Sequence, residues 1–192
     1  MLYCITLTSG EIIGIRESIL VNMSKLFQCP AYHKAGYENI IKSIKWQSFF
    51  TSKGEHHWLG DGVYFWQYFE DAVWWPGDYK DPVILIADLE CEENDFLDLD
   101  DIDVRNAFYA FMAAAFEEMA KRGKNIQTNE IVNGASCNYF KELFHIELIR
   151  YSFPDKSNRP QFCATEAKIA KNIRIANEDL ARFIKEYPYA YI

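Results

Sequence analysis

A glycine-rich turn leads directly into an aromatic strand in the segment Trp58–Trp66, and these residue types can hold a flat ring. The two glycines of the segment let the backbone turn tightly and approach a ligand closely. The run Val-Tyr-Phe-Trp favours a β-strand and places Tyr64 and Trp66 on one face of it. A second aromatic set, which includes Trp74, follows in the chain. We therefore expect two aromatic surfaces that sandwich a planar ligand; the alternative is a turn followed by a core strand.

Two other short pieces carry polar groups that suit ligand binding. The stretch Tyr32–Ala35, which contains His33, ends an expected strand, and Pro160–Thr165, which contains Gln161, begins a later one. A single histidine at a strand end is more often structural than functional. The order of the two pieces around the glycine-rich turn makes the set informative.

Together the three pieces resemble the ADP-ribosyltransferase superfamily, in its branch with a His-Tyr-Glu signature, which includes diphtheria-like toxins and poly-ADP-ribose polymerases. The first family motif has the form Tyr-His-Gly-Thr or Tyr-His-Gly-Ser, and Tyr32–Ala35 is similar to it. The next motif has the form Gly-Xaa-Gly-Ile-Tyr-Phe, then an alanine and an aromatic residue; Gly60–Phe65 with Ala72 and Trp74 is a close match. The third is a strand that begins with Glu, and Pro160–Thr165 takes its place. The resemblance covers about residues 29–176.

The resemblance implies that NAD is the substrate. His33 would donate a hydrogen bond to the adenosine-side ribose, Tyr64 would stack on the nicotinamide, and Trp74 would close the other side of the ring. Backbone groups around His33 would bind the nicotinamide amide, and the strained geometry of the bound ring would favour its loss. The implied catalytic residues are His33, Tyr64 and Gln161. The implied NAD-binding residues are His33, Lys34, Ala35, Gly62, Tyr64 and Trp74, and no metal is implied.

Gln161 is where the chain departs from the family pattern, because the family has Glu at this place. An amide can hydrogen-bond the reacting ribose but cannot stabilise its positive charge, a loss worth about 3 kcal/mol. Three explanations are open: a native glutamine branch that transfers a single ADP-ribose, a degenerate NAD binder, or a Glu-to-Gln change introduced to spare an expression host. Glu166 is a nearby carboxylate on the opposite strand parity.

The activity that the resemblance implies is mono-ADP-ribosyl transfer from NAD to a nucleic-acid base or a protein side chain. Stand-alone bacterial transferases of this kind resemble the toxins of toxin–antitoxin and anti-phage systems, so a protein antitoxin is an expected partner. The alternative is a catalytically degenerate NAD-binding or protein-interaction module. A third possibility is a transferase fold that hydrolyses NAD.

The elements that must position these residues are short strands with helices between them. Strands are expected near residues 29–33, 63–66, 82–89, 96–99, 146–153, 161–165 and 172–175. Helices are expected near residues 38–45, 67–75, 101–122, 129–144 and 177–186. This order predicts an α+β fold, and the resemblance specifies the split antiparallel sheets with inserted helices of the ADP-ribosyltransferases. We expect one domain over residues 1–192, with an N-terminal hairpin at 2–17 inside an extension of about 1–28.

Composition limits the cellular compartments and the binding partners that can be expected for this chain. The 192 residues suffice for one core, and 16% of them are aromatic. A net charge of −8 disfavours tight nonspecific binding to long nucleic acid. The five cysteines lack a short Cys-Xaa-Xaa-Cys spacing, which disfavours a disulfide framework and fits a reducing cytosol. With no signal peptide or membrane-length apolar run, a cytoplasmic protein is expected.

The adjacent pair His56-His57 is the other candidate site. Neighbouring residues on a strand point to opposite faces, so one metal ion cannot easily use both imidazoles. Without a third ligand at a useful spacing, the pair does not predict a metal site.

Overall fold

The fold is seen in a computed structural model that describes residues 25–54, 57–77, 79–123, 132–154 and 158–188. The described strands are β1 Leu26–Gly36, β2 Val63–Trp66, β3 Pro82–Glu92, β4 Phe96–Asp98, β5 Leu148–Ser152, β6 Pro160–Ala164 and β7 Ala170–Ile175. The described helices are α2 Tyr37–Trp46, α3 Phe69–Trp74, α4 Ile102–Lys121, α5 Gly134–Phe144 and α6 Asn177–Glu186. Two short 3-10 turns, Glu93–Asp95 and Ala167–Ile169, precede β4 and β7. The predicted α+β class is confirmed.

The strands form one seven-stranded sheet in the order β4-β5-β6-β2-β1-β3-β7. β4 and β5 run parallel, and the other neighbours are antiparallel. β1 and β3 pair along their full lengths, from Leu26 opposite Glu92 to Gly36 opposite Pro82. By contrast, β2 meets β1 at a single register pair, Tyr32 opposite Trp66. The sheet is therefore nearly divided between β1 and β2.

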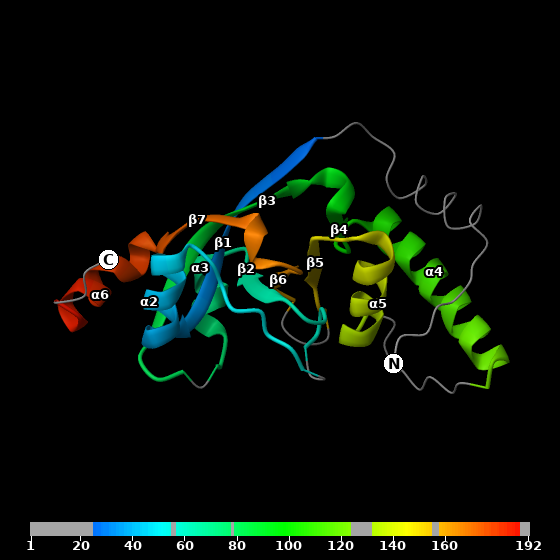
Figure 1. The fold of residues 1–192 in the computed structure, drawn as a ribbon, viewed down its shortest axis with the longest axis horizontal. Coiled ribbons are helices and arrows are strands. Elements are labelled where there is room, and N and C mark those ends of the chain that lie inside the picture. The colour runs from blue at the N-terminus through cyan, green and yellow to red at the C-terminus, as the bar shows by residue number, and fades with distance from the viewer. Residues whose placement is uncertain (1–24, 55–56, 78, 124–131, 155–157, 189–192) are drawn as a thin grey trace.

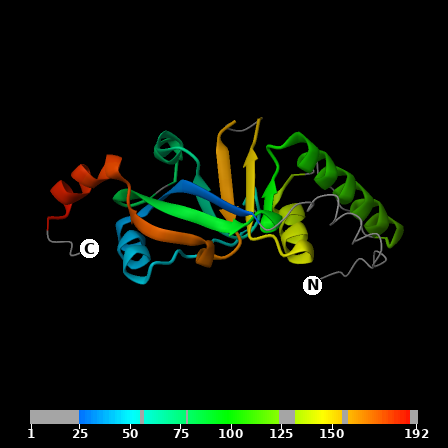
Figure 2. The same ribbon diagram turned by 90° about the horizontal axis from the view of Figure 1, so that it is seen from above.

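The helices lie around the two ends of the sheet, and two hydrophobic cores support it. α4 and α5 lie beside the β4–β5 end, whereas α2, α3 and α6 lie around the β1–β3–β7 end (Figures 1 and 2). One core contains the buried residues of β1, β3 and β7 together with Ile40 of α2 and Phe183 of α6, and it continues across the sheet to buried residues of β2, β5 and β6. The other joins β4 and β5 to the aromatic stripe of α4 and α5, including Phe108, Phe111 and Phe140. Adjacent residues of one strand, such as Leu148 and Ile149 of β5, belong to different cores, so the two cores cover opposite faces of the sheet.

Local sequence explains why the helices begin and end where they do. The Asp101 carboxylate caps α4 by accepting hydrogen bonds from the backbone amides of Asp103 and Val104, at 2.8 and 3.1 Å. Gly123, at φ +74°, ends the same helix in the left-handed conformation that glycine adopts freely. Asn133 caps α5 through the amide of Ser136.

Element bounds follow the predictions closely, with differences at some ends. α6 has the predicted bounds, while β1 begins at Leu26 rather than at residue 29 because its long pairing with β3 extends it. The hairpin expected at residues 2–17 lies outside the described residues, so the N-terminal extension and the single-domain organisation remain predictions. No helix in the described ranges is both long and apolar enough to cross a bilayer.

Candidate functional site

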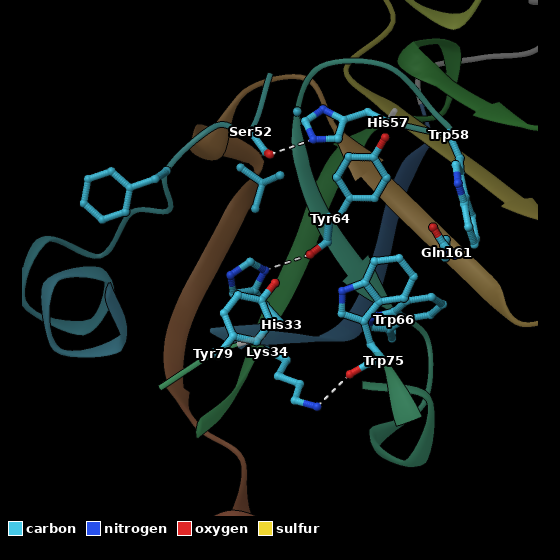
Figure 3. Close-up of a pocket in the computed structure, with 13 residues that line it drawn as sticks. His33, Lys34, Ser52, His57, Trp58, Tyr64, Trp66, Trp75, Tyr79 and Gln161 are labelled. Carbon is cyan, nitrogen blue, oxygen red and sulfur yellow. Dashed lines mark hydrogen bonds between the residues drawn. The ribbon is translucent and has the colours of Figure 1, made fainter. Parts of the chain in front are cut away.

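A cavity of about 190 Å³ opens where β2 separates from β1 (Figure 3). Its lining residues come from β1, the loop between α2 and β2, β2, the segment between α3 and β3, and β6. They are His33, Lys34, Phe50, Ser52, His57, Trp58, Gly62, Val63, Tyr64, Trp66, Trp75, Tyr79 and Gln161. Typical small-molecule sites measure roughly 300–1000 Å³. The cavity therefore suits one ring of a ligand, with the rest of the molecule lying outside it.

His33 bridges the gap between the diverging strands. Its Nδ1 lies 2.8 Å from the carbonyl oxygen of Tyr64, so Nδ1 carries the proton and donates to that oxygen. The imidazole also packs against Phe49 and Phe65, with ring centroids 4.8 and 5.7 Å away. Burial lowers the pKa of His33, although the bond to Tyr64 opposes the shift. A neutral His33 has Nε2 left over for another partner.

The Tyr64 hydroxyl is occupied by the glycine-rich turn. It donates to the Gly60 carbonyl at 2.8 Å and accepts from the Leu59 amide at 2.9 Å. Burial raises the pKa of Tyr64 far above its usual value. The hydroxyl is therefore unsuited to proton transfer, while the ring forms part of the cavity wall (Figure 3).

Gln161 lies opposite Trp66 in the β2–β6 ladder and lines the same cavity. The residue is 2% exposed, and its Nε2 is buried with no hydrogen-bond partner among the described residues. A buried amide nitrogen without a partner costs free energy, about 1–3 kcal/mol. Such a group is accounted for if a ligand oxygen accepts from it. His33, Tyr64 and Gln161, far apart in the sequence, are thus brought to one cavity.

Other predicted binding residues have different places. The Lys34 ammonium lines the cavity but donates to the carbonyls of Val73 and Trp75, at 3.0 and 2.7 Å, where α3 ends. Ala35 is buried in the core and does not line the cavity. Trp74 also differs from the prediction: it is 45% exposed, beneath the Arg159 guanidinium, which lies 4.8 Å from its ring centroid.

Trp75 takes the wall position that was expected of Trp74. The helix α3 ends at Trp74, and the chain leaves it at Trp75, whose backbone conformation is no longer helical. Trp75 then packs on Trp66 at 5.3 Å and on Trp58 at 5.6 Å between ring centroids. Sequence alone cannot choose between adjacent tryptophans, because the end of a short helix decides which of them turns inward.

Gly62 is required by the close approach of β2 and β6. A Cβ at this position would lie 2.5 Å from both the Ala164 carbonyl oxygen and the Cys163 sulfur. The sequence predicts glycine at this position because a ligand approaches the backbone. In the structure Gly62 lines the cavity, and the packing of β2 on β6 also requires glycine. Glu166, the alternative carboxylate, is exposed and pairs with Lys168 at 3.3 Å beyond the end of β6, outside the cavity lining.

Two polar residues of the cavity were missed as a functional pair. Ser52 Oγ lies 2.9 Å from His57 Nε2, and both side chains line the cavity (Figure 3). The sequence suggests His57 only as a metal ligand beside His56. No short window of the sequence signals this pair, because the backbone pairing of Ser52 with Gly62 across the loop is what places the serine beside the histidine. In the described residues, no three His, Cys, Asp or Glu side chains gather as a metal site.

Comparisons with known proteins add little to this geometry. No protein-family model matches the chain, and no solved structure matches it. The chain is similar to the protein printed as "Uncharacterized protein MJ0359" from the archaeon Methanocaldococcus jannaschii. The two are 26% identical over 147 residues, which cover 69% of this chain and 68% of the archaeal protein. This similarity assigns no family.

Proposed function

We propose that the protein is a mono-ADP-ribosyltransferase that cleaves NAD in the β1–β2 cavity. The observation that carries the proposal is the convergence of His33, Tyr64 and Gln161, each from a different motif, on one cavity. The single register pair between β1 and β2 supports an ADP-ribosyltransferase-like split of the sheet. The described helices lie around both ends of the sheet, which also supports this proposal.

The cavity suits the nicotinamide end of NAD. In this proposal the nicotinamide ring stacks on Tyr64, and Trp66 and Trp75 complete an aromatic wall around it. His33, neutral and fixed through Nδ1, offers Nε2 to a ribose hydroxyl proton. This reverses the direction expected from the sequence, because Nδ1 already holds the ring proton against Tyr64. Because the cavity has room for one ring, the adenosine half of NAD would lie along the protein surface outside it.

Gln161 supplies the contact to the reacting ribose. Its buried Nε2 has no partner in the described chain and can donate to a ribose hydroxyl oxygen. The amide orients the sugar but brings no negative charge to the oxocarbenium-like transition state. The proposed transferase therefore relies on binding strain and on ring stacking for much of its rate.

The acceptor is proposed to be a macromolecule, either a nucleic-acid base or a protein side chain. An effector of this kind in a bacterial toxin–antitoxin or anti-phage system would require a protein antitoxin in the cytoplasm. Both the acceptor class and the antitoxin come from the family resemblance. Mass spectrometry of total RNA, DNA and protein after brief induction with labelled NAD would identify the acceptor.

Release of nicotinamide from NAD tests the proposed activity. The protein should release nicotinamide, and Gln161→Ala should lose this activity because no side-chain bond to the ribose remains. Gln67→Ala is the matched control: Gln67 bonds Tyr68 outside the cavity and should leave the rate unchanged. Calorimetric NAD binding without any nicotinamide release would favour the alternative, a non-catalytic NAD-binding module. Absence of NAD binding would overturn both.

A further inference from the structure

The cavity lining contains no carboxylate among the described residues. Transfer of ADP-ribose to an oxygen or nitrogen nucleophile releases a proton, which some group must accept. The Gln161 amide cannot accept it, and the Tyr64 hydroxyl is held between Leu59 and Gly60. The Nδ1 of His33 donates to the Tyr64 carbonyl, and its Nε2 binds the ribose in the proposed function. His57 is the remaining imidazole in the lining.

His57 has the surroundings of a proton acceptor. Its Nε2 faces Ser52 Oγ at 2.9 Å on the cavity wall. Its Nδ1 is buried without a hydrogen-bond partner in the described chain and lies 4.0 Å from Asp61 Oδ1. Asp61 Oδ1 accepts from the Gly54 amide at 3.3 Å and stands on the Nδ1 side of the ring, so a proton on Nδ1 is next to a carboxylate and the Nε2 lone pair faces Ser52 and the cavity. This order of serine, histidine and carboxylate is one in which an imidazole is activated as a base.

The helix α5 holds this group in place. The Asp61 amide donates to Asn138 Oδ1 at 2.7 Å, and the Asp61 carbonyl accepts from Lys141 Nζ at 2.6 Å. The backbone of His57 packs so closely on α5 that a Cβ at Gly134 would lie 2.2 Å from the His57 carbonyl oxygen. Two bonds and a tight backbone contact therefore fix Asp61 and His57 relative to the cavity, as a catalytic base requires.

We propose that His57 is the general base of the transfer reaction, oriented by Asp61, and that Ser52 relays the proton. The inference rests on the proposed function. The bond between ribose C1′ and the nicotinamide nitrogen breaks, and its electron pair leaves with neutral nicotinamide. A lone pair of the acceptor forms the new bond to C1′. The acceptor proton passes to Ser52 Oγ as the Ser52 hydroxyl proton moves to His57 Nε2, so charge and protons balance.

A reaction with azide distinguishes a general base from a residue that only supports the structure. The azide anion carries no proton, so it needs no base to attack C1′. In the first assay water is the acceptor, and the release of free ADP-ribose from NAD is measured. In the second assay sodium azide is added, and the formation of ADP-ribosyl azide is measured. His57→Ala should lower hydrolysis about a hundredfold or more. The same variant should form ADP-ribosyl azide within a few-fold of the parent rate. Ser52→Ala should lose less hydrolysis, because water can then reach Nε2 directly.

Further variants make the outcome decisive. His57→Gln keeps a hydrogen bond to Ser52 but accepts no proton, so it should show the same loss of hydrolysis and the same retained azide reaction. Asp61→Asn should show an intermediate loss, and His145→Asn, a change at an exposed histidine outside the cavity, should match the parent. Undiminished hydrolysis in His57→Ala, or loss of both reactions in both His57 variants, overturns the base role alone. A parent that releases no nicotinamide overturns the proposed transferase as well.

Discussion

At position 161, a glutamine amide stands where a carboxylate would help the proposed reaction most. Its Nε2 is buried and unpartnered in the described chain, so a ligand oxygen would relieve a cost already present in the free protein. A side chain kept in this condition is typical of a binding site rather than of a core. The same burial makes the position sensitive to charge, because an ionised group there would be largely desolvated.

Gln161→Glu should keep or increase ADP-ribosyl transfer and should not abolish it, because a negative charge is most useful in the transition state. A large increase in kcat/KM would identify the parent as an attenuated form, and a similar rate would identify a native glutamine enzyme. Steady-state nicotinamide release measures this. An inactive but folded and NAD-binding Gln161→Glu protein would contradict the placement of the third motif.

Tyr64 should act through its ring. Tyr64→Phe keeps the cavity wall and should retain most nicotinamide release, while stability falls by about 1–3 kcal/mol because Leu59 and Gly60 lose their hydroxyl partner. Tyr64→Ala should lose most of the release. Urea denaturation and NAD turnover measure the two effects separately. Equal loss of turnover in both variants, at temperatures where both are folded, would argue against stacking.

At the scale of elements, local signals predicted most of the fold. The periodicity and end signals of α2, α4 and α6 lie in contiguous residues, so helix bounds could be read directly. The length of β1 could not, because it depends on pairing with β3, whose residues follow their β1 partners by 46 positions (Gly36 and Pro82) to 66 positions (Leu26 and Glu92). The near break between β1 and β2 is likewise a tertiary property, supported from the sequence only through family resemblance.

The residues of the candidate site also fall into two groups: those that short sequence motifs predict and those that long-range contacts place. His33, Tyr64 and Gln161 stand in motifs with local character, and each lines the cavity. Ser52 and His57 were missed because their pairing depends on a loop closed by the Ser52–Gly62 bridge. The choice of Trp75 over Trp74 depends on where a six-residue helix ends. Loop closure and helix ends are set by long-range contacts that no short window of sequence contains.

Lys34 connects two elements that form the cavity. Its ammonium, on β1, bonds the Val73 and Trp75 carbonyls at the end of α3 and thereby fixes the Trp75 wall. Lys34→Met should raise the KM for NAD several-fold, and stability should fall by about 1 kcal/mol because the contact is partly solvated. Lys42→Met, on the exposed side of α2, is the matched control. An unchanged KM would mean that α3 holds its position without Lys34.

At the scale of the whole molecule, the sheet has a weakly paired junction between β1 and β2, and the cavity lies at this junction. Backbone pairing between β1 and β2 is limited to one register position, so side chains carry much of the contact at this junction. The His33 bond to the Tyr64 carbonyl is one of these contacts and spans the two strands directly. His33 therefore belongs both to the contact between β1 and β2 and to the proposed ligand site.

This arrangement predicts a pH dependence of stability with a definite sign. Burial lowers the folded-state pKa of His33 below the value of about 6.5 expected in the unfolded chain. The unfolded chain then binds more protons below that pH, so the free energy of unfolding is full above about pH 6.5 and declines as the pH falls. For one group the slope is at most about 1.4 kcal/mol per pH unit.

His33→Gln should flatten this decline. Glutamine can still donate to the Tyr64 carbonyl but does not titrate, so the variant should lose less stability than the parent between pH 7 and pH 5. Urea denaturation at several pH values measures both slopes. Because the remaining histidines are common to parent and His33→Gln, the difference between their slopes isolates His33. Coincident slopes would show that the junction does not desolvate His33, and its assignment as a neutral hydrogen-bonding partner for ribose would then fail.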